Sequence, residues 1–462
     1  MRRLLILALG PLLALLTLLL PLPPAERRVA ALTAWMVAWW LTEAVPLGVT
    51  SLLPLALLPA LGVLTPKEAS APYANELIFL FLAGFLLARA LEHWKAHERL
   101  AYGIVARTGL GGPQMLLGLM LATGLLSMFV SNTATAAMMY PIALALGGFV
   151  PADAAGDRTR TALMLGIAFA ASIGGIGTLI GTPPNLIMAA AAESLTGRHL
   201  GFGEYLLIGV PAVLVLLPAA WALLAFGTCR GMAAAPPAAA AVLRERHAAL
   251  GPLVGSERRV VAIFALTALA WVWPGEKPFS DAAIGLLGAT LLFVVPAGAP
   301  HGDRPLLAWD EARSLPWDVL LLFGGGLSLA AGMEASGLTA RLAGSLAGLG
   351  GSPRPVIYLA LAALVVALSE IASNTAVAAL MMPLVASLGG ATGIPTIELI
   401  VVTGLAASAG FALPVATPPN AIAFGSGLVP VRTMARTGIW LDLIAILVVV
   451  LLASLLVPLV VR

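Results

Sequence analysis

The chain has 462 residues, of which 60% are hydrophobic and 10% are charged, and its formal net charge is +3. This small share of charged side chains is not enough to cover the surface of a soluble protein. The composition therefore indicates a polytopic membrane protein in contact with the lipid bilayer. The small net charge gives no reason to expect a nucleic-acid partner, because basic residues of membrane proteins mainly set topology. The single cysteine, Cys229, excludes an intramolecular disulfide and a thiolate metal cage.

The apolar stretches predict an all-α protein with about eleven transmembrane helices, since each crossing needs about 20 residues. The first stretch, within residues 1–28, follows Arg2 and Arg3 and resembles a signal peptide. No small-residue cleavage site precedes the next span, so we expect this stretch to remain as a first helix outside the repeats. Most later basic residues alternate consistently with a cytoplasmic N-terminus in an inner membrane, although Arg27 and Arg28 do not.

Residues 29–227 are expected to form the first of two repeats, and a re-entrant hairpin is its first unusual element. The stretch 114–150 is too long for one crossing and too short for two, which favours such a hairpin. The Ser-Asn-Thr sequence at 131–133 would lie at its turn. Irregular backbone at membrane depth is tolerated only where protein or a water-filled cavity surrounds it. We therefore expect the turn to line a cavity.

The stretch 161–192 is expected to form a broken helix, because Thr182 precedes two consecutive prolines, Pro183 and Pro184. Two prolines remove two amide donors and force the preceding residue out of helical geometry. Upstream carbonyl groups, such as that of Gly181, then lose their helical partners. Such carbonyl groups are available to a cation.

A polar linker at 228–258, expected to be cytoplasmic, separates the first repeat from the second, 259–462. Ser-Asn-Thr recurs 242 residues later, at 373–375, and Thr-Pro-Pro-Asn recurs 235 residues later, at 417–420. The corresponding elements of the second repeat are a hairpin at 355–390 and a broken helix at 396–428. If each repeat holds five crossings, an odd number, the two repeats enter the membrane in opposite orientations.

The motif segments carry no Lys or Arg between residues 113 and 152, 161 and 197, or 356 and 431. Helix N-termini at the Ser-Asn-Thr turns would present free N–H groups and a positive dipole end, which favours an anion in the cavity. Burying carboxylates is costly unless they are paired, so we expect co-bound cations. Asn132 and Asn374 suit both partners, because an amide offers a carbonyl oxygen to a cation and N–H donors to an anion.

The doubled motifs, with a Trp-Trp-Leu-Thr-Glu-Ala-Val-Pro segment at 39–46, resemble the divalent anion/sodium symporter family, the dicarboxylate and citrate carriers. The resemblance covers nearly the whole chain. It implies a homodimeric elevator-type importer of a di- or tricarboxylate, with a C4 dicarboxylate such as succinate, malate or fumarate favoured. Sodium would be the coupling ion, without an organic cofactor. A fixed scaffold domain would comprise 1–112 and 259–345, and a moving transport domain 113–227 and 355–462.

The same resemblance implies the roles of individual residues. The implied sodium ligands are Ser127, Ser131, Asn132 and Gly181 in the first copy, and Ser369, Ala372, Asn374 and Ala416 in the second. The implied substrate contacts are Ser131, Asn132, Thr133, Thr182 and Pro183 in the first copy, and Ser373, Asn374, Thr375, Thr417 and Pro418 in the second.

Several alternatives stay open. A sodium-independent dicarboxylate exchanger belongs to the same family, and an anion channel or an intramembrane enzyme would belong to other classes. The histidines fall outside the spans or at their ends, so no buried base would activate Ser131 or Ser373 as a nucleophile. Glu370, the acid within the second hairpin, could take a coupling role or a structural one, because the first copy has Met128 at that position.

Overall fold

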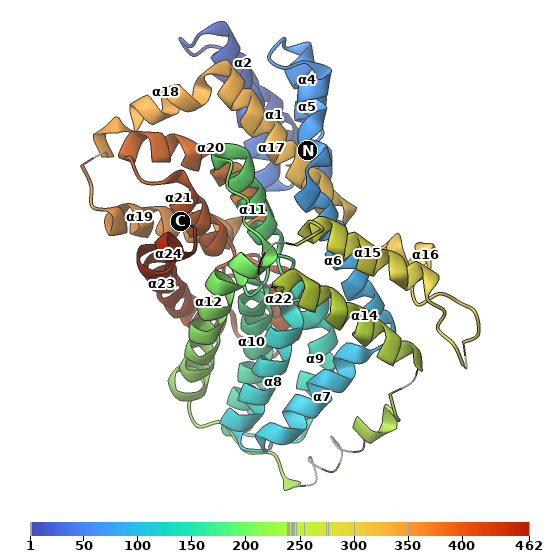
Figure 1. Ribbon diagram of the computed structural model, residues 1–462. Helices are drawn as coiled ribbons and strands as arrows, with labels where there is room; N and C mark the ends of the chain where they lie inside the picture. Colours follow the sequence, from blue (N-terminus) through green and yellow to red (C-terminus); the bar gives the residue numbers. More distant parts are fainter. Residues whose placement is uncertain are drawn as a thin grey trace.

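The computed structural model describes residues 2–461 apart from 238–240, 242–244, 246, 254, 274, 276, 300 and 350. Across these residues the chain is helical, and the only β pairing among them is an isolated bridge between Pro296 and Pro305 (Figure 1). The all-α prediction is therefore confirmed for the described part of the chain. The linker expected at 228–258 lies partly outside the described residues.

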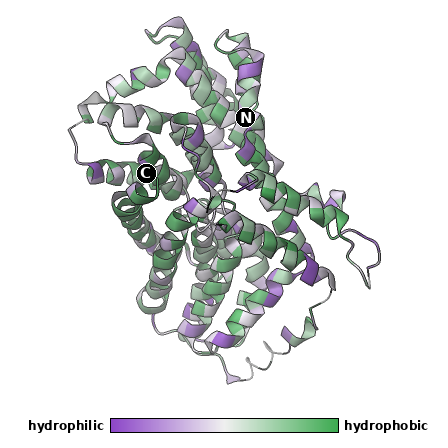
Figure 2. Cartoon of the chain, viewed as in Figure 1, coloured by the Kyte–Doolittle hydropathy of each residue, from purple (hydrophilic) through white to green (hydrophobic). Residues whose placement is uncertain are grey.

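Within the described part of the chain, six helical segments are long and apolar enough to cross a membrane. They are Pro66–His93, Phe202–Thr228, Trp317–Ser336, Arg354–Ile371, Asn374–Thr392 and Val431–Val460. Hydrophobic residues dominate the helices in Figure 2. Large apolar side chains such as Leu214, Leu447 and Leu455 remain exposed on the surface of the chain, as expected where lipid rather than water is the solvent. The chain is a multi-pass membrane protein.

The N-terminal part consists of two long helices packed against each other, followed by short ones. The first pair ends at Glu43, which caps the second helix in the left-handed conformation. In chain order the elements are α1 (Arg2–Thr17), α2 (Pro24–Thr42), α3 (Leu47–Thr50), α4 (Leu53–Ala60), α5 (Pro66–Ser70) and η1 (Ala71–Ala74).

The order of helices after residue 75 occurs twice. The first series is α6 (Glu76–His93), α7 (Ala96–Thr108), α8 (Gly112–Ser127), α9 (Asn132–Gly148), α10 (Ala154–Gly175), α11 (Pro183–Thr196) and α12 (Phe202–Ala222), which continues as η2 (Leu223–Thr228). The second series is α17 (Trp317–Ser336), α18 (Leu338–Ser345), η3 (Ala347–Leu349), α19 (Arg354–Ile371), α20 (Asn374–Thr392), α21 (Thr396–Ala407), α22 (Pro418–Gly425) and α23 (Val431–Leu455), which ends with α24 (Val457–Val460). Between the two series lie α14 (Gly255–Val272), α15 (Asp281–Val294) and α16 (Trp309–Ala312).

The buried centre of each series is the helix that precedes the Thr-Pro-Pro break, α10 in the first and α21 in the second. Every residue of α10 from Thr161 to Gly175 is buried, and α8, α9, α12 and α22 pack against it. A Cβ at Gly174 would lie 2.2 Å from the backbone oxygen of Gly124, so the close approach of α8 and α10 requires glycine. This packing brings the end of α8 against the end of α10, where both motifs lie.

Candidate functional site

The first Ser-Asn-Thr motif forms the turn between α8 and α9, which run side by side in Figure 1. The helix α8 ends at Ser127 and α9 begins at Asn132. Ser131 caps α9, because its hydroxyl accepts a hydrogen bond from the Ala134 amide at 3.3 Å, as serine commonly does at this position. Ser131 and Asn132 are half-buried and Thr133 is exposed, so a ligand can reach all three.

A cluster of oxygen atoms surrounds Ser127, which is fully buried. Its hydroxyl lies 2.8 Å from Asn132 Oδ1 and 2.7 Å from the backbone oxygen of Ala171. A hydroxyl has one proton, so it donates to only one of these two acceptors at a time. Converging neutral oxygens are the ligands that hard cations take, and in transporters such oxygens at broken helices coordinate Na⁺.

The first helix break lies directly against this turn. Thr182 is extended, with φ −145° and ψ 145°, and α11 begins immediately after it. A Cβ at Gly175, the last residue of α10, would lie 2.3 Å from Asn132 Oδ1. A Cβ at Gly181 would lie 3.0 Å from the backbone oxygen of Met128. The fold therefore brings three of the predicted sodium ligands of the first copy, namely Ser127, Asn132 and Gly181, to one place.

The second copy is similar around Ser369 but lacks the contact between the serine hydroxyl and the asparagine oxygen. Its hydroxyl donates to the backbone oxygen of Ala407 at 3.2 Å. A Cβ at Gly410 would lie 3.2 Å from the Ser369 backbone oxygen and 3.4 Å from Ala416 Cβ. Asn374 Oδ1 is buried and has no hydrogen-bond partner among the described residues. Leaving a buried oxygen without a partner costs free energy. A cation bound to this oxygen would remove that cost.

The remaining predicted residues lie at the same turns and breaks. Their positions are as follows: Ala372 and Ser373 form the turn between α19 and α20, Thr375 is half-buried in the first turn of α20, Thr417 caps α22 by accepting from the Asn420 amide at 3.2 Å, and Pro183 and Pro418 are the first residues of α11 and α22.

Two asparagines that were not predicted as site residues hold the two breaks in shape. Each is fully buried, and its Nδ2 donates to the carbonyl groups ten and seven residues earlier. The partners of Asn185 are Gly175 (2.9 Å) and Thr178 (2.7 Å), and those of Asn420 are Gly410 (3.3 Å) and Leu413 (3.0 Å). The signal was present in the sequence, because each is the last residue of a Thr-Pro-Pro-Asn motif.

Two buried acids also contact the second break. Glu370 accepts hydrogen bonds from the amides of Ala412 and Leu413 at 2.8 and 2.7 Å. Asp442 on α23 accepts one from the Phe411 amide at 3.1 Å. Both carboxyl groups are thus used to hold backbone, which favours a positioning role for Glu370 over direct ligation. Asp442 was missed, although it is the only acid in the apolar stretch 438–461.

Buried broken helices, two Ser-Asn-Thr turns between paired helices and oxygen-lined breaks are typical of a secondary transporter. The chain belongs to the divalent anion/sodium symporter family: the family described as "Sodium:sulfate symporter transmembrane region" matches residues 1–461. Similar relatives include the sodium-dependent dicarboxylate transporters SdcS of Staphylococcus saprophyticus, 41% identical, and Staphylococcus aureus, 39% identical. Each match covers 98% of this chain and 91% of the relative.

The fold is also similar to that of the YdaH transporter of Alcanivorax borkumensis, known from a crystal structure. The TM-score is 0.57, and the match covers 87% of this chain and 88% of that one. The sequence identity is only 13%. This likeness concerns the fold alone.

Proposed function

We propose that the protein imports a C4 dicarboxylate such as succinate, malate or fumarate, coupled to sodium. The observation that carries the proposal is the cluster of neutral oxygens around Ser127 at the first turn and break, with a corresponding Ser369–Ala407 contact and an unpartnered Asn374 oxygen in the second copy. These segments carry no basic side chain. Two relatives with sodium-dependent dicarboxylate transporter names support both the ion and the substrate class.

The charge balance of the site explains why sodium is needed. The N-termini of α9, α11, α20 and α22 lie at the turns and breaks, and each helix end supplies about half a positive charge. These ends partly offset a dianion, but the desolvation cost of carboxylates remains large without counter-ions. Sodium ions at Ser127, Asn132 and Gly181, and at Ser369, Asn374 and Ala416, would complete the balance.

The substrate would lie between the two turns. Its carboxylates would accept hydrogen bonds from the side-chain amides of Asn132 and Asn374 and from hydroxyl groups nearby. The candidate hydroxyl donors are Ser131, Thr133, Thr182, Ser373, Thr375 and Thr417. The asparagine amides then face sodium with Oδ1 and substrate with Nδ2, which couples the two binding events.

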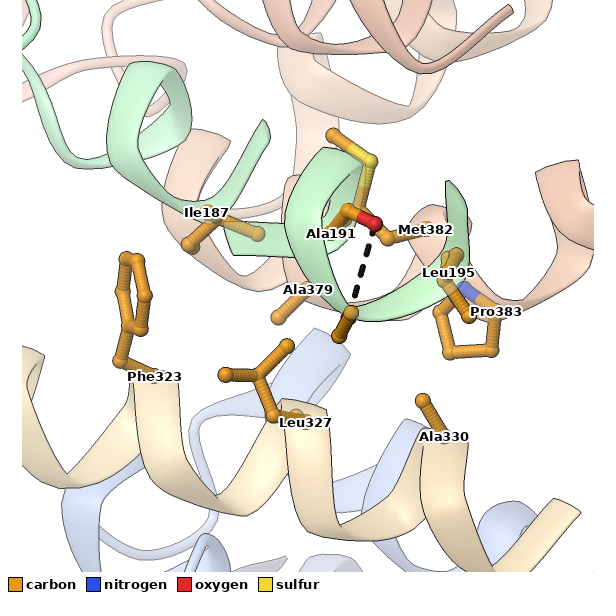
Figure 3. Close-up of a pocket in the computed structure, with 11 residues that line it drawn as sticks. Ile187, Ala191, Leu195, Phe323, Leu327, Ala330, Ala379, Met382 and Pro383 are labelled. Atoms are coloured by element: carbon orange, nitrogen blue, oxygen red, sulfur yellow. Dashed lines mark hydrogen bonds between the residues drawn. The ribbon is translucent and has the colours of Figure 1, made fainter. Parts of the chain in front are cut away.

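We further propose an elevator mechanism in a homodimer of the inner membrane, with re-entrant hairpins, inverted repeats and a cytoplasmic N-terminus. A small pocket between α11, α17 and α20 supports the sliding step (Figure 3). Its lining is almost entirely apolar, with Phe323, Leu327 and Ala330 on α17 facing Ile187 and Ala191 on α11. The single hydrogen bond drawn there lies within α11. Because no hydrogen bond between α17 and the other two helices is drawn in this pocket, α11 and α20 can slide along α17 without breaking one there.

Uptake of radiolabelled succinate into proteoliposomes tests the transport proposal. We expect uptake with an inward sodium gradient and little uptake when choline replaces sodium. Equal uptake in both buffers, with stimulation by internal dicarboxylate, would instead assign the protein to the sodium-independent exchangers. Uptake of sulfate in place of succinate would contradict the substrate class.

Cross-linking across the pocket of Figure 3 tests the moving domain. In a Cys229→Ser background, cysteines at Ala191 and Leu327 join α11 to α17, and we expect their cross-linking to stop transport while sodium binding persists. The matched control joins Ala191 to Met382 on α20, within the same proposed transport domain. Cross-linking of the control pair should leave transport intact, and full transport after complete cross-linking of the first pair would exclude the elevator.

A further inference from the structure

Both helix breaks are held by an asparagine, Asn185 in the first and Asn420 in the second. The other side chains that hydrogen-bond to the backbone of each break, called tethers below, differ between the two repeats. Positions of the two breaks correspond at a separation of 235 residues, so Ile176 matches Phe411 and Thr178 matches Leu413. Positions in the preceding hairpins correspond at 242 residues, so Met128 matches Glu370. The tethers at these matched positions can therefore be compared directly.

In the first repeat, neutral hydroxyl groups donate to backbone carbonyl groups. Tyr205 Oη donates to the carbonyl oxygen of Ile176 at 2.7 Å, and Thr178 Oγ1 donates to the carbonyl oxygen of Met128. Both tethers therefore occupy carbonyl oxygens beside the break. No negative charge is brought to the first site by these contacts.

In the second repeat, carboxyl groups accept from backbone amides at the matched positions. Asp442 accepts from Phe411, and Glu370 accepts from Ala412 and Leu413. These tethers therefore use backbone amides rather than carbonyl oxygens. Carboxyl tethers are not possible at these positions of the first repeat, because Met128 and Leu207 occupy the positions that match Glu370 and Asp442.

The acids are costly to bury and lie beside the second cation site. Glu370 and Asp442 are 9% and 7% exposed, and neither forms a salt bridge with a basic residue in the described part of the chain. Glu370 directly follows Ser369, and the segment it holds packs against Ser369 through Gly410. Asn374 Oδ1 of the second site is buried and has no hydrogen-bond partner in the described part of the chain, whereas Asn132 Oδ1 of the first site already accepts from Ser127. A cation bound in the second site would satisfy this oxygen and offset the cost of burying the two carboxyl groups.

We propose that the two sodium sites are unequal, and that the site of the second repeat, beside Glu370 and Asp442, binds sodium more tightly and is filled first. This inference rests on the proposed sodium coupling and goes beyond it by ranking the sites. Glu370 and Asp442 act as positioning residues, which hold the second break and supply charge without touching substrate. The first site, lined by neutral oxygens alone, fills at higher sodium concentration.

Equilibrium binding of radioactive sodium to the purified protein without substrate tests the ranking. We expect two classes of site in the unmodified protein. Ser369→Ala should abolish the tighter class, and Ser127→Ala should abolish the weaker one. The double variant Glu370→Gln, Asp442→Asn should weaken the tighter class by about tenfold or more, the effect of losing a charged hydrogen-bond partner. Sodium binding to the weaker class should persist in this variant, which shows that the variant is folded.

Tyr205→Phe is the matched control, because it removes the neutral tether of the first repeat and should leave the tighter class unchanged. Loss of the tighter class in Ser127→Ala, or equal weakening of both classes in the double acid variant, would overturn the ranking. Absence of sodium binding in the unmodified protein would overturn the proposed coupling, and the ranking with it.

Discussion

A single methyl group at Gly175 should disable the first sodium site while leaving the fold intact. The Cβ of Gly175→Ala would lie 2.3 Å from Asn132 Oδ1, 2.9 Å from Nδ2 and 3.0 Å from Cγ, whereas ordinary contact begins at 3.4 Å. The Asn132 amide must therefore move by about 1 Å, and a misplacement of this size can cost about a hundredfold in activity. We expect sodium-dependent succinate uptake to fall by about that factor.

The loss should come from the site and not from unfolding. The obstructing atoms belong to the end of a half-buried side chain rather than to backbone, so the cost of overpacking should stay at about 1–3 kcal/mol. Thermal unfolding of the purified protein, measured beside proteoliposome uptake, separates the two effects. Gly148→Ala is the matched control, because a Cβ there meets nothing within 4 Å, and it should transport normally.

The second repeat offers a graded comparison. A Cβ at Gly410 would lie 3.2 Å from its nearest neighbour, the Ser369 backbone oxygen, so Gly410→Ala should impair transport less than Gly175→Ala does. Normal sodium affinity and uptake in Gly175→Ala would refute the reasoning, because the Asn132 oxygen could then be displaced without consequence for the site.

Three further predictions follow from individual contacts. Asn132→Ala and Asn374→Ala should each lower sodium affinity and succinate affinity together, and a change in only one affinity would refute the shared-ligand argument. Burial raises the pKa of the Cys229 thiol to about 11, so little reactive thiolate forms at pH 8; maleimide labelling should be slow in the folded protein and fast after denaturation. Arg99 forms a bidentate salt bridge with Glu257 at 2.8 and 3.1 Å. Arg99→Ala leaves the buried Glu257 side chain without its partner and should lower the free energy of unfolding by about 3 kcal/mol. The melting temperature should fall, and adding Glu257→Gln should partly restore it.

Local chemistry explains why much of the site could be predicted from the sequence. A serine caps the helix that follows it, and a proline begins a helix after an extended residue; both effects depend on residues within one turn. The starts of α9 at Asn132 and of α11 at Pro183 therefore follow from their neighbours in the sequence. The duplication of both motifs then indicated that two such places exist. The turn and the break of the first copy lie in close contact, with Gly175 against Asn132.

The sequence by itself therefore determined the membrane class, the doubled helix order and the residues of the turns and breaks, because these depend on composition, periodicity and local backbone rules. Only the tertiary structure decided what tethers each break. Tyr205 reaches Ile176 and Asp442 reaches Phe411 across about thirty residues, a separation at which spacing carries no information about contact. The opposite polarity of these tethers arises from helix packing, which sets whether a carbonyl group or an amide faces the neighbouring side chain.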